Sequence, residues 1–374
     1  MPPTNGLKLD SRRIGGIACL TGTSVIYLLT LAPTVQGFDS AELTVGAYAL
    51  GFVHAPGYPL YMVLGHTFSW LPLGDVGWCL NLMSAVFASL TIWLLFWLIC
   101  KDADDVAAAL PTVLLFATTP IFWSQALRAE VYTLHTFLMV SALYLWRQAH
   151  QRHESRWYLS AFLVLGWGMG NHLTTILLWG TLLLSLIWEP PRFRRLGILG
   201  TAGGIAIASL LYLYFPLRSL YSPDIDYITP YFHVDLGSPA GVWWLLSAKM
   251  FQHEAYWGGS WFQIVQELSR FGTSLSIGYL GVGAILGIWG WWVQRKTEIL
   301  WNRLLTIYFV LNVITFVFYH VADKEVMFVP AYAVWAIWVA RGIWALGNWL
   351  HRHLAGLDIR MSKIYTSAPL LLII

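Results

Sequence analysis

Charged residues are scarce in this chain of 374 residues: they make up 11% of it, while 57% of it is hydrophobic. Soluble proteins carry roughly 25% charged residues, so the composition excludes a soluble protein and predicts a polytopic membrane protein. The net charge of +3 is too small, and its basic residues are too scattered, for a nucleic-acid-binding surface. Cysteine is also rare. Cys19, Cys79 and Cys100 lie in apolar stretches without CxxC or Cys/His spacing, which gives no support to a disulfide framework or a zinc site.

Long apolar runs predict an all-α membrane bundle with about eight full spans, because a crossing helix needs about 20 mostly apolar residues. The eight runs are 14–33, 76–100, 106–124, 131–146, 196–217, 271–293, 303–320 and 326–347. The run 157–188 differs, because it is long for one span and short for two, and three glycines precede Asn171 in its middle. We expect a short broken hairpin whose helices meet near Asn171 and His172. Such a break is tolerated where the backbone faces protein or a water-filled cavity.

The basic residues predict a cytoplasmic N-terminus, because most of them then fall on the inside. We expect one membrane domain over 1–374, with a first outer loop at 34–75 and a second outer region at 218–270. The first loop should hold an interfacial helix and a re-entrant turn. The chain ends in Leu370-Leu371-Leu372-Ile373-Ile374, which is similar to the start of another span, so a C-terminal part could be missing.

Ionisable residues return to the predicted outer side, which makes them functional candidates. Asp39 and Glu42 are three residues apart and share one face of any helix that begins there. They could form a capping arrangement, with Asp39 as the N-cap and Glu42 at N3. Alternatively, a carboxylate here could act as a general base toward a hydroxyl. The two interpretations are compatible.

The next outer segment, His54-Ala55-Pro56-Gly57-Tyr58-Pro59-Leu60, has the composition of a rigid turn that re-enters the bundle. It could be a simple helix break, in which His54 donates a hydrogen bond. Two carboxylates and His54 could also bind a divalent metal, although no spacing demands one.

The other candidates each have a structural alternative. Arg128 and Glu130 could form a surface ion pair at the start of the helix that contains His135, or Arg128 could bind a phosphate oxygen. Asn171 and His172 could be satisfied core residues or could line a cavity. Among the remaining outer candidates, Arg218 could be an arginine that snorkels to the membrane surface, and Asp323 and Lys324 could lie in a solvated loop.

Five motifs in order give the chain a family resemblance. They are Phe38-Asp39-Ser40-Ala41-Glu42, Leu50-Gly51-Phe52-Val53-His54-Ala55-Pro56-Gly57-Tyr58-Pro59-Leu60, Asn81-Leu82-Met83-Ser84, Ala129-Glu130-Val131-Tyr132-Thr133-Leu134-His135 and Gly170-Asn171-His172-Leu173-Thr174. This set resembles a former domain-of-unknown-function family that includes the animal protein O-mannosyltransferases, part of the GT-C glycosyltransferase superfamily. The resemblance spans residues 14 to about 220. The chain has Ala55-Pro56 where the family often has two prolines.

The resemblance implies an inverting transferase that uses a polyprenyl- or dolichyl-phosphate-linked sugar on the extracytoplasmic or lumenal face. Asp39 occupies the position of the family's essential acidic residue and would act as the base, with Glu42 beside it. Arg128, Arg218 and Lys324 would bind the donor phosphate. The acceptor could be a protein hydroxyl, a glycan or a lipid. A substrate pocket would contain His54, Tyr58, Glu130, His135, Asn171, His172 and Asp323.

The implied membrane is the bacterial inner membrane, or the endoplasmic reticulum membrane in a eukaryote, and no cofactor beyond a divalent metal is suggested. A transporter or flippase of lipid-linked sugar is the main alternative, because an interrupted helix also suits such a protein. A non-catalytic scaffold is a weaker alternative, since a scaffold has no need for carboxylates and arginines that converge on one side.

Overall fold

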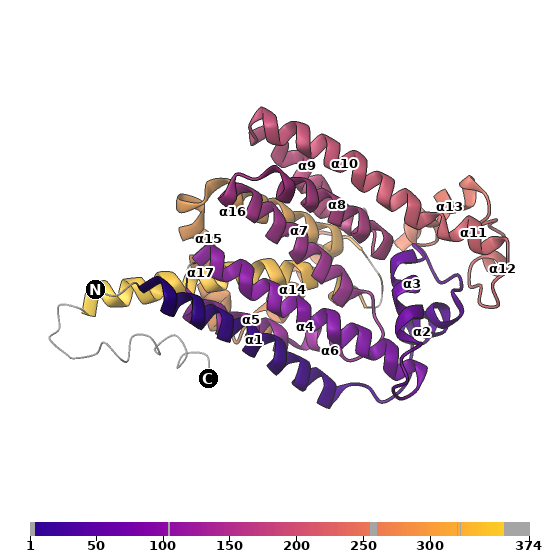
Figure 1. Cartoon of the computed structure of the whole chain (residues 1–374), viewed down its shortest axis with the longest axis horizontal. Coiled ribbons are helices and arrows are strands. Elements are labelled where there is room, and N and C mark those ends of the chain that lie inside the picture. Colours follow the sequence, from indigo (N-terminus) through magenta and orange to yellow (C-terminus); the bar gives the residue numbers. More distant parts are fainter. Residues whose placement is uncertain (1–3, 104, 255–259, 320, 322, 355–374) are drawn as a thin grey trace.

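The computed structural model describes residues 4–103, 105–254, 260–319, 321 and 323–354, and these form a helical bundle (Figure 1). Phe52 and Asp226 form an isolated parallel bridge between two loops. The all-α prediction is therefore confirmed for the described part of the chain. The expected C-terminal tail, 370–374, lies outside the described residues.

The first half of the chain contains ten helical elements. They are α1 (Thr4–Thr30), α2 (Asp39–Ala49), α3 (Pro59–Phe68), α4 (Val76–Ala103), α5 (Val106–Thr118), α6 (Pro120–Ala126), α7 (Tyr132–Arg152), α8 (Ser155–Asn171), α9 (Thr175–Ser185) and the 3-10 helix η1 (Leu186–Trp188). The second half contains α10 (Pro191–Tyr212), α11 (Tyr214–Ser219), α12 (Thr229–Phe232), α13 (Pro239–Leu246), η2 (Lys249–Glu254), α14 (Trp261–Gly278), α15 (Val282–Thr297), α16 (Ile299–Val317), η3 (Lys324–Phe328) and α17 (Val329–Leu354).

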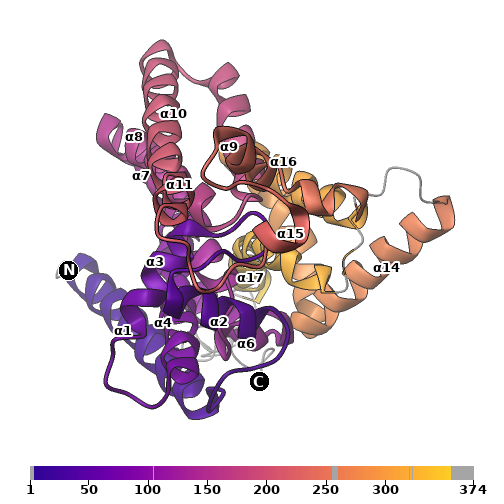
Figure 2. The same cartoon turned by 90° about the vertical axis from the view of Figure 1, so that its right-hand side faces the viewer.

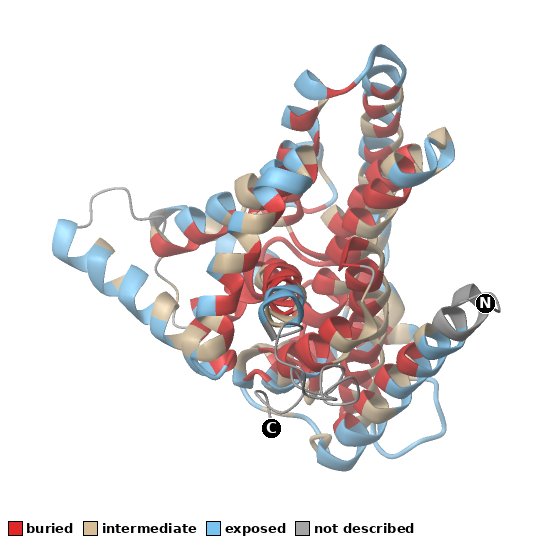
Figure 3. Cartoon of the chain, turned by 90° about the vertical axis from the view of Figure 1, so that its left-hand side faces the viewer, coloured by how far each residue is buried: buried red, intermediate tan, exposed pale blue. Residues whose placement is uncertain are grey.

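Five helical segments in the described part are long and apolar enough to cross a membrane, and two bent helix pairs raise the number to seven. The chain is thus a multi-pass membrane protein, while the count of eight spans stays a prediction. The most enclosed candidate is the segment of η3 and α17, whose apolar window is 89% buried. Buried residues occupy the centre of the bundle, and exposed ones face outward (Figure 3). Glycines allow α15 and α17 to approach closely, since a Cβ on Gly290 would lie 1.8 Å from the Trp338 carbonyl oxygen.

The helix ends divide into two groups at opposite ends of the bundle. The predicted inner connections meet at one end, where Arg147 contacts both Asp102 and Glu298, and His150 contacts Glu189. At the other end lie α2, α3 and the α11–α13 region (Figure 1); we call this the α2 end. This separation agrees with the predicted topology. Which end faces the cytoplasm, and the domain boundaries, stay predictions.

The broken hairpin has the expected form. Helix α8 ends at Asn171 and α9 begins at Thr175, so the break falls at the residues where the glycine-interrupted run predicts it. Helix α10 packs against α8, and a Cβ on Gly166 would lie 2.4 Å from the carbonyl oxygen of Gly204. The glycines of this run therefore serve close helix packing as well as the break.

Two of the predicted spans are bent. The run 106–124 bends by 69° between α5 and α6, because Pro120 starts a new helix and holds Thr119 extended. The run 271–293 bends by 102° between α14 and α15. Leu280 and Gly281 both have positive φ there, which ends one helix and redirects the chain. Helix α14 projects from the bundle (Figure 2), so only α15 follows the direction expected of that span.

Candidate functional site

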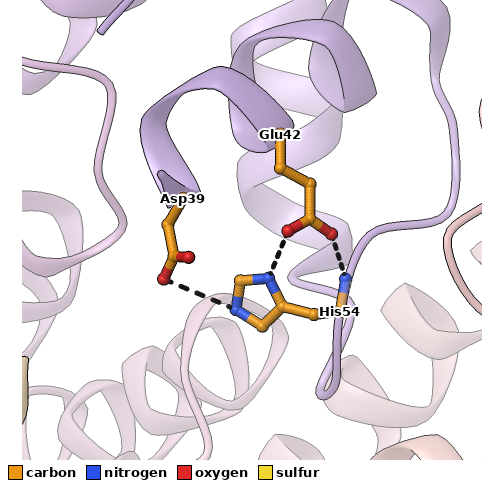
Figure 4. A group of neighbouring side chains, drawn as sticks. All are labelled: Asp39, Glu42 and His54. Carbon is orange, nitrogen blue, oxygen red and sulfur yellow. Dashed lines mark hydrogen bonds and ion pairs between the residues drawn. The ribbon is translucent and has the colours of Figure 1, made fainter. Parts of the chain in front are cut away.

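A helix is present where the sequence predicts an interfacial one: this is α2, and Asp39 is its first residue. Its position at a membrane interface stays a prediction. Its N-cap is Phe38, with φ 59°, and no side chain caps the helix. The capping interpretation of Asp39 is therefore wrong, since its carboxylate is not used on the helix backbone. Asp39 and Glu42 instead lie one turn apart, and both side chains point toward His54 (Figure 4).

Glu42 holds His54 from two directions. One carboxylate oxygen accepts the backbone N–H of His54 at 2.6 Å, and the other lies 2.9 Å from Nδ1 of the imidazole (Figure 4). On the far side of the ring, Nε2 lies 2.8 Å from the Tyr58 hydroxyl and 3.9 Å from Oδ2 of Asp39. The imidazole is therefore fixed between the two carboxylates.

Two of these groups have shifted pKa values. Burial, with the negative charges of Asp323 and Glu42, raises the pKa of Asp39 above 3.8, although His54 and Arg128 act in the opposite direction. Burial alone would lower the pKa of His54, but the hydrogen bond to Glu42 and the charges of Glu42 and Asp39 leave it raised above 6.5. A carboxylate with a raised pKa is a better proton acceptor than an ordinary aspartate, so Asp39 suits a general base.

The turn that carries His54 is fixed by packing from a distant part of the chain. Gly57 has φ +83°, and a Cβ there would lie 2.3 Å from the buried ring of Phe215. The Tyr212 hydroxyl donates to the Pro56 carbonyl at 3.3 Å. Tyr58 is the N-cap of α3 and stacks on His172 at 5.9 Å between ring centroids. The predicted re-entrant turn is thus rigid because α10 and α11 enclose it.

Arg128 and Glu130 lie in the loop between α6 and α7, and their charged atoms are 3.3 Å apart. Glu130 is buried, so this is not the surface ion pair considered from the sequence. Burial, with the charges of Asp39 and Asp323, raises the pKa of Glu130 to about 8, against the opposing charge of Arg128. Asn81 and Ser84 hold this loop, since Asn81 Oδ1 accepts the Ala129 N–H at 2.8 Å and Ser84 Oγ accepts the Glu130 N–H at 3.2 Å.

The predicted pocket residues of the hairpin tip lie behind Tyr58. The His172 ring stacks on Tyr58 and lies 5.3 Å from that of His135. Thr174 joins the two histidines, because its hydroxyl lies 2.7 Å from His172 Nδ1 and 3.1 Å from His135 Nε2. Asn171 donates to the Val131 carbonyl at 3.0 Å. These groups form a buried polar layer beneath the turn, so His135 and Asn171 support the site from within.

The three candidate phosphate-binding cations are placed differently. Arg128 acts electrostatically on Asp39 and remains partly exposed. Arg218 instead donates to the carbonyls of Leu50 at 2.9 Å and Ala49 at 3.3 Å, at the end of α2. Lys324 is buried, with Nζ 2.8 Å from Glu267. Of the three, Arg128 is therefore the cation best placed to face a ligand at Asp39.

Asp323 joins the site from the far end of the sequence. It is exposed, and its charge raises the pKa values of Asp39 and Glu130. We call Asp39, Glu42, Glu130 and Asp323 the acidic cluster. Two members of this cluster, Asp39 and Glu42, form with His54 a group that could hold a metal ion, because one ligand atom of each lies within 4.8 Å of the others.

Two large cavities lie beside this site, although Asp39 lines neither. The first, of about 620 Å³, is apolar and lies between α9, α10 and α13, where it reaches Tyr212 and Pro216. Tyr212, which lines it, donates to the carbonyl of Pro56 in the turn that carries His54. The second, of about 760 Å³, lies between α6, α14 and α17 and reaches Glu325, the neighbour of Lys324. We call them the α10 groove and the α14 groove.

The sequence argument assigned no role to Asn81, Ser84 and Thr174, which position the site residues described above. All three fall within the five ordered motifs. Polar residues in apolar helical runs are the signal that could have found them.

Comparisons with known proteins agree with the family resemblance of the motifs. Residues 39–194 match the family described as "Protein O-mannosyl-transferase TMEM260 N-terminal domain". The chain is 29% identical over 126 residues to the protein O-mannosyl-transferase TMEM260 of Mus musculus, and this match covers 33% of the chain and 18% of the mouse protein. It is 27% identical over 155 residues to tmem260 of Dictyostelium discoideum, which covers 39% of the chain and 19% of that protein. The chain thus matches less than a fifth of each relative's length.

The fold is shared with a solved structure. ArnT from Cupriavidus metallidurans bound to undecaprenyl phosphate matches with a TM-score of 0.62 at 15% identity, over 95% of this chain and 68% of ArnT. Its apo structure matches with a TM-score of 0.61 at 16% identity. The resemblance expected from the motifs is therefore confirmed: the chain shares the fold of ArnT and is O-mannosyltransferase-like in sequence over residues 39–194.

Proposed function

We propose that this protein transfers a sugar from a polyprenyl- or dolichyl-phosphate carrier to a hydroxyl group on the extracytoplasmic or lumenal face of its membrane. The observation that carries the proposal is the placement of Asp39. Its carboxylate lies at the start of α2, is 43% exposed, has a raised pKa and faces a histidine fixed by Glu42. A partly exposed base at the membrane edge suits an acceptor that arrives from outside the bilayer.

The α10 groove suits the lipid part of the donor. It is lined by side chains such as Trp179, Ile205 and Trp243, and also by Tyr212, which donates to the turn that carries His54. A prenyl chain is apolar, so burying it there is favourable. The solved ArnT structure with undecaprenyl phosphate supports a carrier of this kind for the shared fold.

Arg128 is our candidate for the donor phosphate. A guanidinium can donate two parallel hydrogen bonds to phosphate oxygens. Its partner Glu130 has a pKa of about 8 and is therefore mostly protonated at pH 7, which leaves the charge of Arg128 uncompensated. Arg218 and Lys324 would each have to give up a present partner before they could reach a phosphate.

The reaction follows from this arrangement. The acceptor oxygen forms a bond to the anomeric carbon, while the bond from that carbon to the phosphate oxygen breaks on the opposite face, which inverts the configuration. Asp39 takes the hydroxyl proton, and the electron pair leaves with the phosphate, whose developing charge Arg128 balances. The acceptor class, whether protein, glycan or lipid, is the part of this function that the assay below is designed to identify.

The test is transfer of radiolabelled sugar from polyprenyl-phosphate-linked donors in membranes that contain the protein. Wild type should move label to an acceptor, and Asp39→Asn should reduce this at least 100-fold, the usual scale for loss of a general base. Asp224→Asn is the matched control, because Asp224 is an exposed carboxylate of the second outer region, and it should retain transfer.

Two outcomes would contradict this proposal. Equal transfer by Asp39→Asn and wild type would remove Asp39 from the mechanism. Label that crosses the bilayer unchanged, in both proteins and without transfer, would favour the transporter alternative.

A further inference from the structure

We propose that Asp39 and His54 bind a divalent cation that also contacts the phosphate of the lipid-linked donor, a site that rests on the proposed function. The charge balance is the first reason. Four carboxyl groups make up the acidic cluster, and the positive charges that act on Asp39 within it are those of His54 and Arg128. Even with Glu130 protonated, the cluster keeps an excess of negative charge, and a donor phosphate would add to it.

The protein's own cations do not remove this excess. Lys324 is buried against Glu267, and Arg218 caps the backbone of α2. A phosphate cannot approach several carboxylates closely unless a positive charge lies between them. A divalent cation supplies that charge and bridges carboxylate and phosphate oxygens, as magnesium does in many phosphate-binding sites.

The geometry is the second reason. Nε2 of His54 and Oδ2 of Asp39 are 3.9 Å apart. An ion about 2.1 Å from each atom would keep them roughly 3 to 4 Å apart, so both can be ligands with little movement. Oδ1 of Asp39 then stays available to the acceptor hydroxyl.

Glu42 prepares His54 for this role. Its carboxylate lies 2.9 Å from Nδ1, which favours a proton on that nitrogen and leaves Nε2, 3.9 Å from Oδ2 of Asp39, as the ring nitrogen that can bind a cation. A carboxylate that accepts the second ring N–H is the usual partner of a metal-bound histidine. The backbone bond from His54 N–H to Glu42, at 2.6 Å, holds the same residue in place. Glu42 is thus a positioning residue for the cation.

Because of Tyr58, we expect binding of the cation to depend on the lipid-linked donor. Its hydroxyl lies 2.8 Å from Nε2, so the cation must displace this hydrogen bond. Two protein ligands alone bind a hard divalent cation weakly, and phosphate oxygens complete its coordination. We therefore expect the cation and the lipid phosphate to bind cooperatively. By linkage, each should tighten the other by the same factor.

The experiment uses the whole chain in detergent, Mn²⁺ as the cation and undecaprenyl phosphate as the lipid. Electron paramagnetic resonance measures free Mn²⁺ during a titration with and without the lipid. Undecaprenyl phosphate should tighten Mn²⁺ binding at least 10-fold in wild type. His54→Gln should abolish this gain, and Glu42→Gln should weaken Mn²⁺ binding 10- to 100-fold, the scale for a lost partner of a metal-bound histidine.

Asp224→Asn is the matched control and should bind Mn²⁺ as wild type does. Thermal unfolding of each variant excludes a loss of folding, and Glu42→Gln keeps the size of the side chain if His54→Gln fails to fold. Mn²⁺ binding that is unaffected by the lipid, or equal in Glu42→Gln and wild type, would overturn this site.

Failure of the cation site and failure of the transferase are distinguishable. Sugar transfer that is lost in Asp39→Asn but unchanged by EDTA would keep the transferase and overturn the cation. Cooperative Mn²⁺ and lipid binding without transfer to any acceptor would keep the cation site and contradict the transferase.

Discussion

Glu130→Gln should remove a large pH dependence from the stability of this protein. Burial raises the pKa of Glu130 from 4.5 to about 8. Between these values the folded chain keeps a proton that the unfolded chain has lost, so stability falls as the pH rises through this window and is level outside it. One pKa unit corresponds to about 1.4 kcal/mol, so the whole window corresponds to about 5 kcal/mol. Glutamine cannot ionise, so the variant lacks this contribution.

The assay is unfolding of wild type and Glu130→Gln in detergent, followed by tryptophan fluorescence from pH 5 to 9. Below pH 8 the Glu130 carboxyl is mostly protonated, so glutamine replaces one uncharged group with another, and any cost of this change to stability is nearly independent of pH. The informative quantity is therefore the difference between the two proteins as a function of pH. It should change in favour of the variant by up to about 5 kcal/mol as the pH rises from 5 to 8.

Glu325→Gln provides the control, because Glu325 is an exposed carboxylate close in sequence to Asp323. Its pH profile should follow that of wild type. Parallel profiles for wild type and Glu130→Gln would refute the reasoning, because they would mean that Glu130 ionises normally despite its burial.

Three further predictions concern packing and charge. Arg147→Ala should destabilise the protein by about 3–5 kcal/mol in thermal unfolding, because it leaves the buried carboxylate of Asp102 without its ion pair. Gln294 donates to the Asp102 carboxylate at 2.6 Å and Arg341 donates to the Asp102 carbonyl at 3.2 Å, and a loss below 1 kcal/mol would mean that these two contacts suffice. Gly57→Ala should lower the unfolding temperature, at a cost of about 1–3 kcal/mol, because the site has φ +83° and its Cβ would meet Phe215; an unchanged temperature would show that Phe215 can move. Arg218→Ala should lower the free energy of unfolding by about 1.5–3 kcal/mol, because the charged hydrogen bonds to the carbonyls of Ala49 and Leu50 are lost. Arg218→Lys should recover part of this stability. Equal stability of wild type and both variants would contradict a capping role.

The hairpin and α2 could be predicted because local sequence determines them. The glycines before Asn171 interrupt an apolar run, and they break the helix at the expected place. Asp39 and Glu42 are three residues apart, which puts both on one face as soon as a helix forms. That His54 would lie between them could not be predicted, because Glu42 reaches His54 across a separation of 12 residues.

The errors arise where tertiary contacts or backbone conformation override hydropathy. The mean hydropathy over 271–293 is that of an apolar span. It carries no information about the positive φ angles of Leu280 and Gly281, which bend the chain. Charge patterns likewise identify Arg218 and Lys324 as outer cations without giving their partners. Those partners, the α2 carbonyls and Glu267, lie far away in the sequence or on another helix.

The site extends beyond the part of the chain that the family match covers. Residues 39–194 contain Asp39, Glu42, His54 and Arg128. The carbonyl of Leu50, at the end of α2, is bound by Arg218, which lies outside this region. Asp323, which raises the pKa values of Asp39 and Glu130, also lies outside it. Changes in these later segments should therefore alter the position and the proton affinity of Asp39 even where every motif of residues 39–194 is intact.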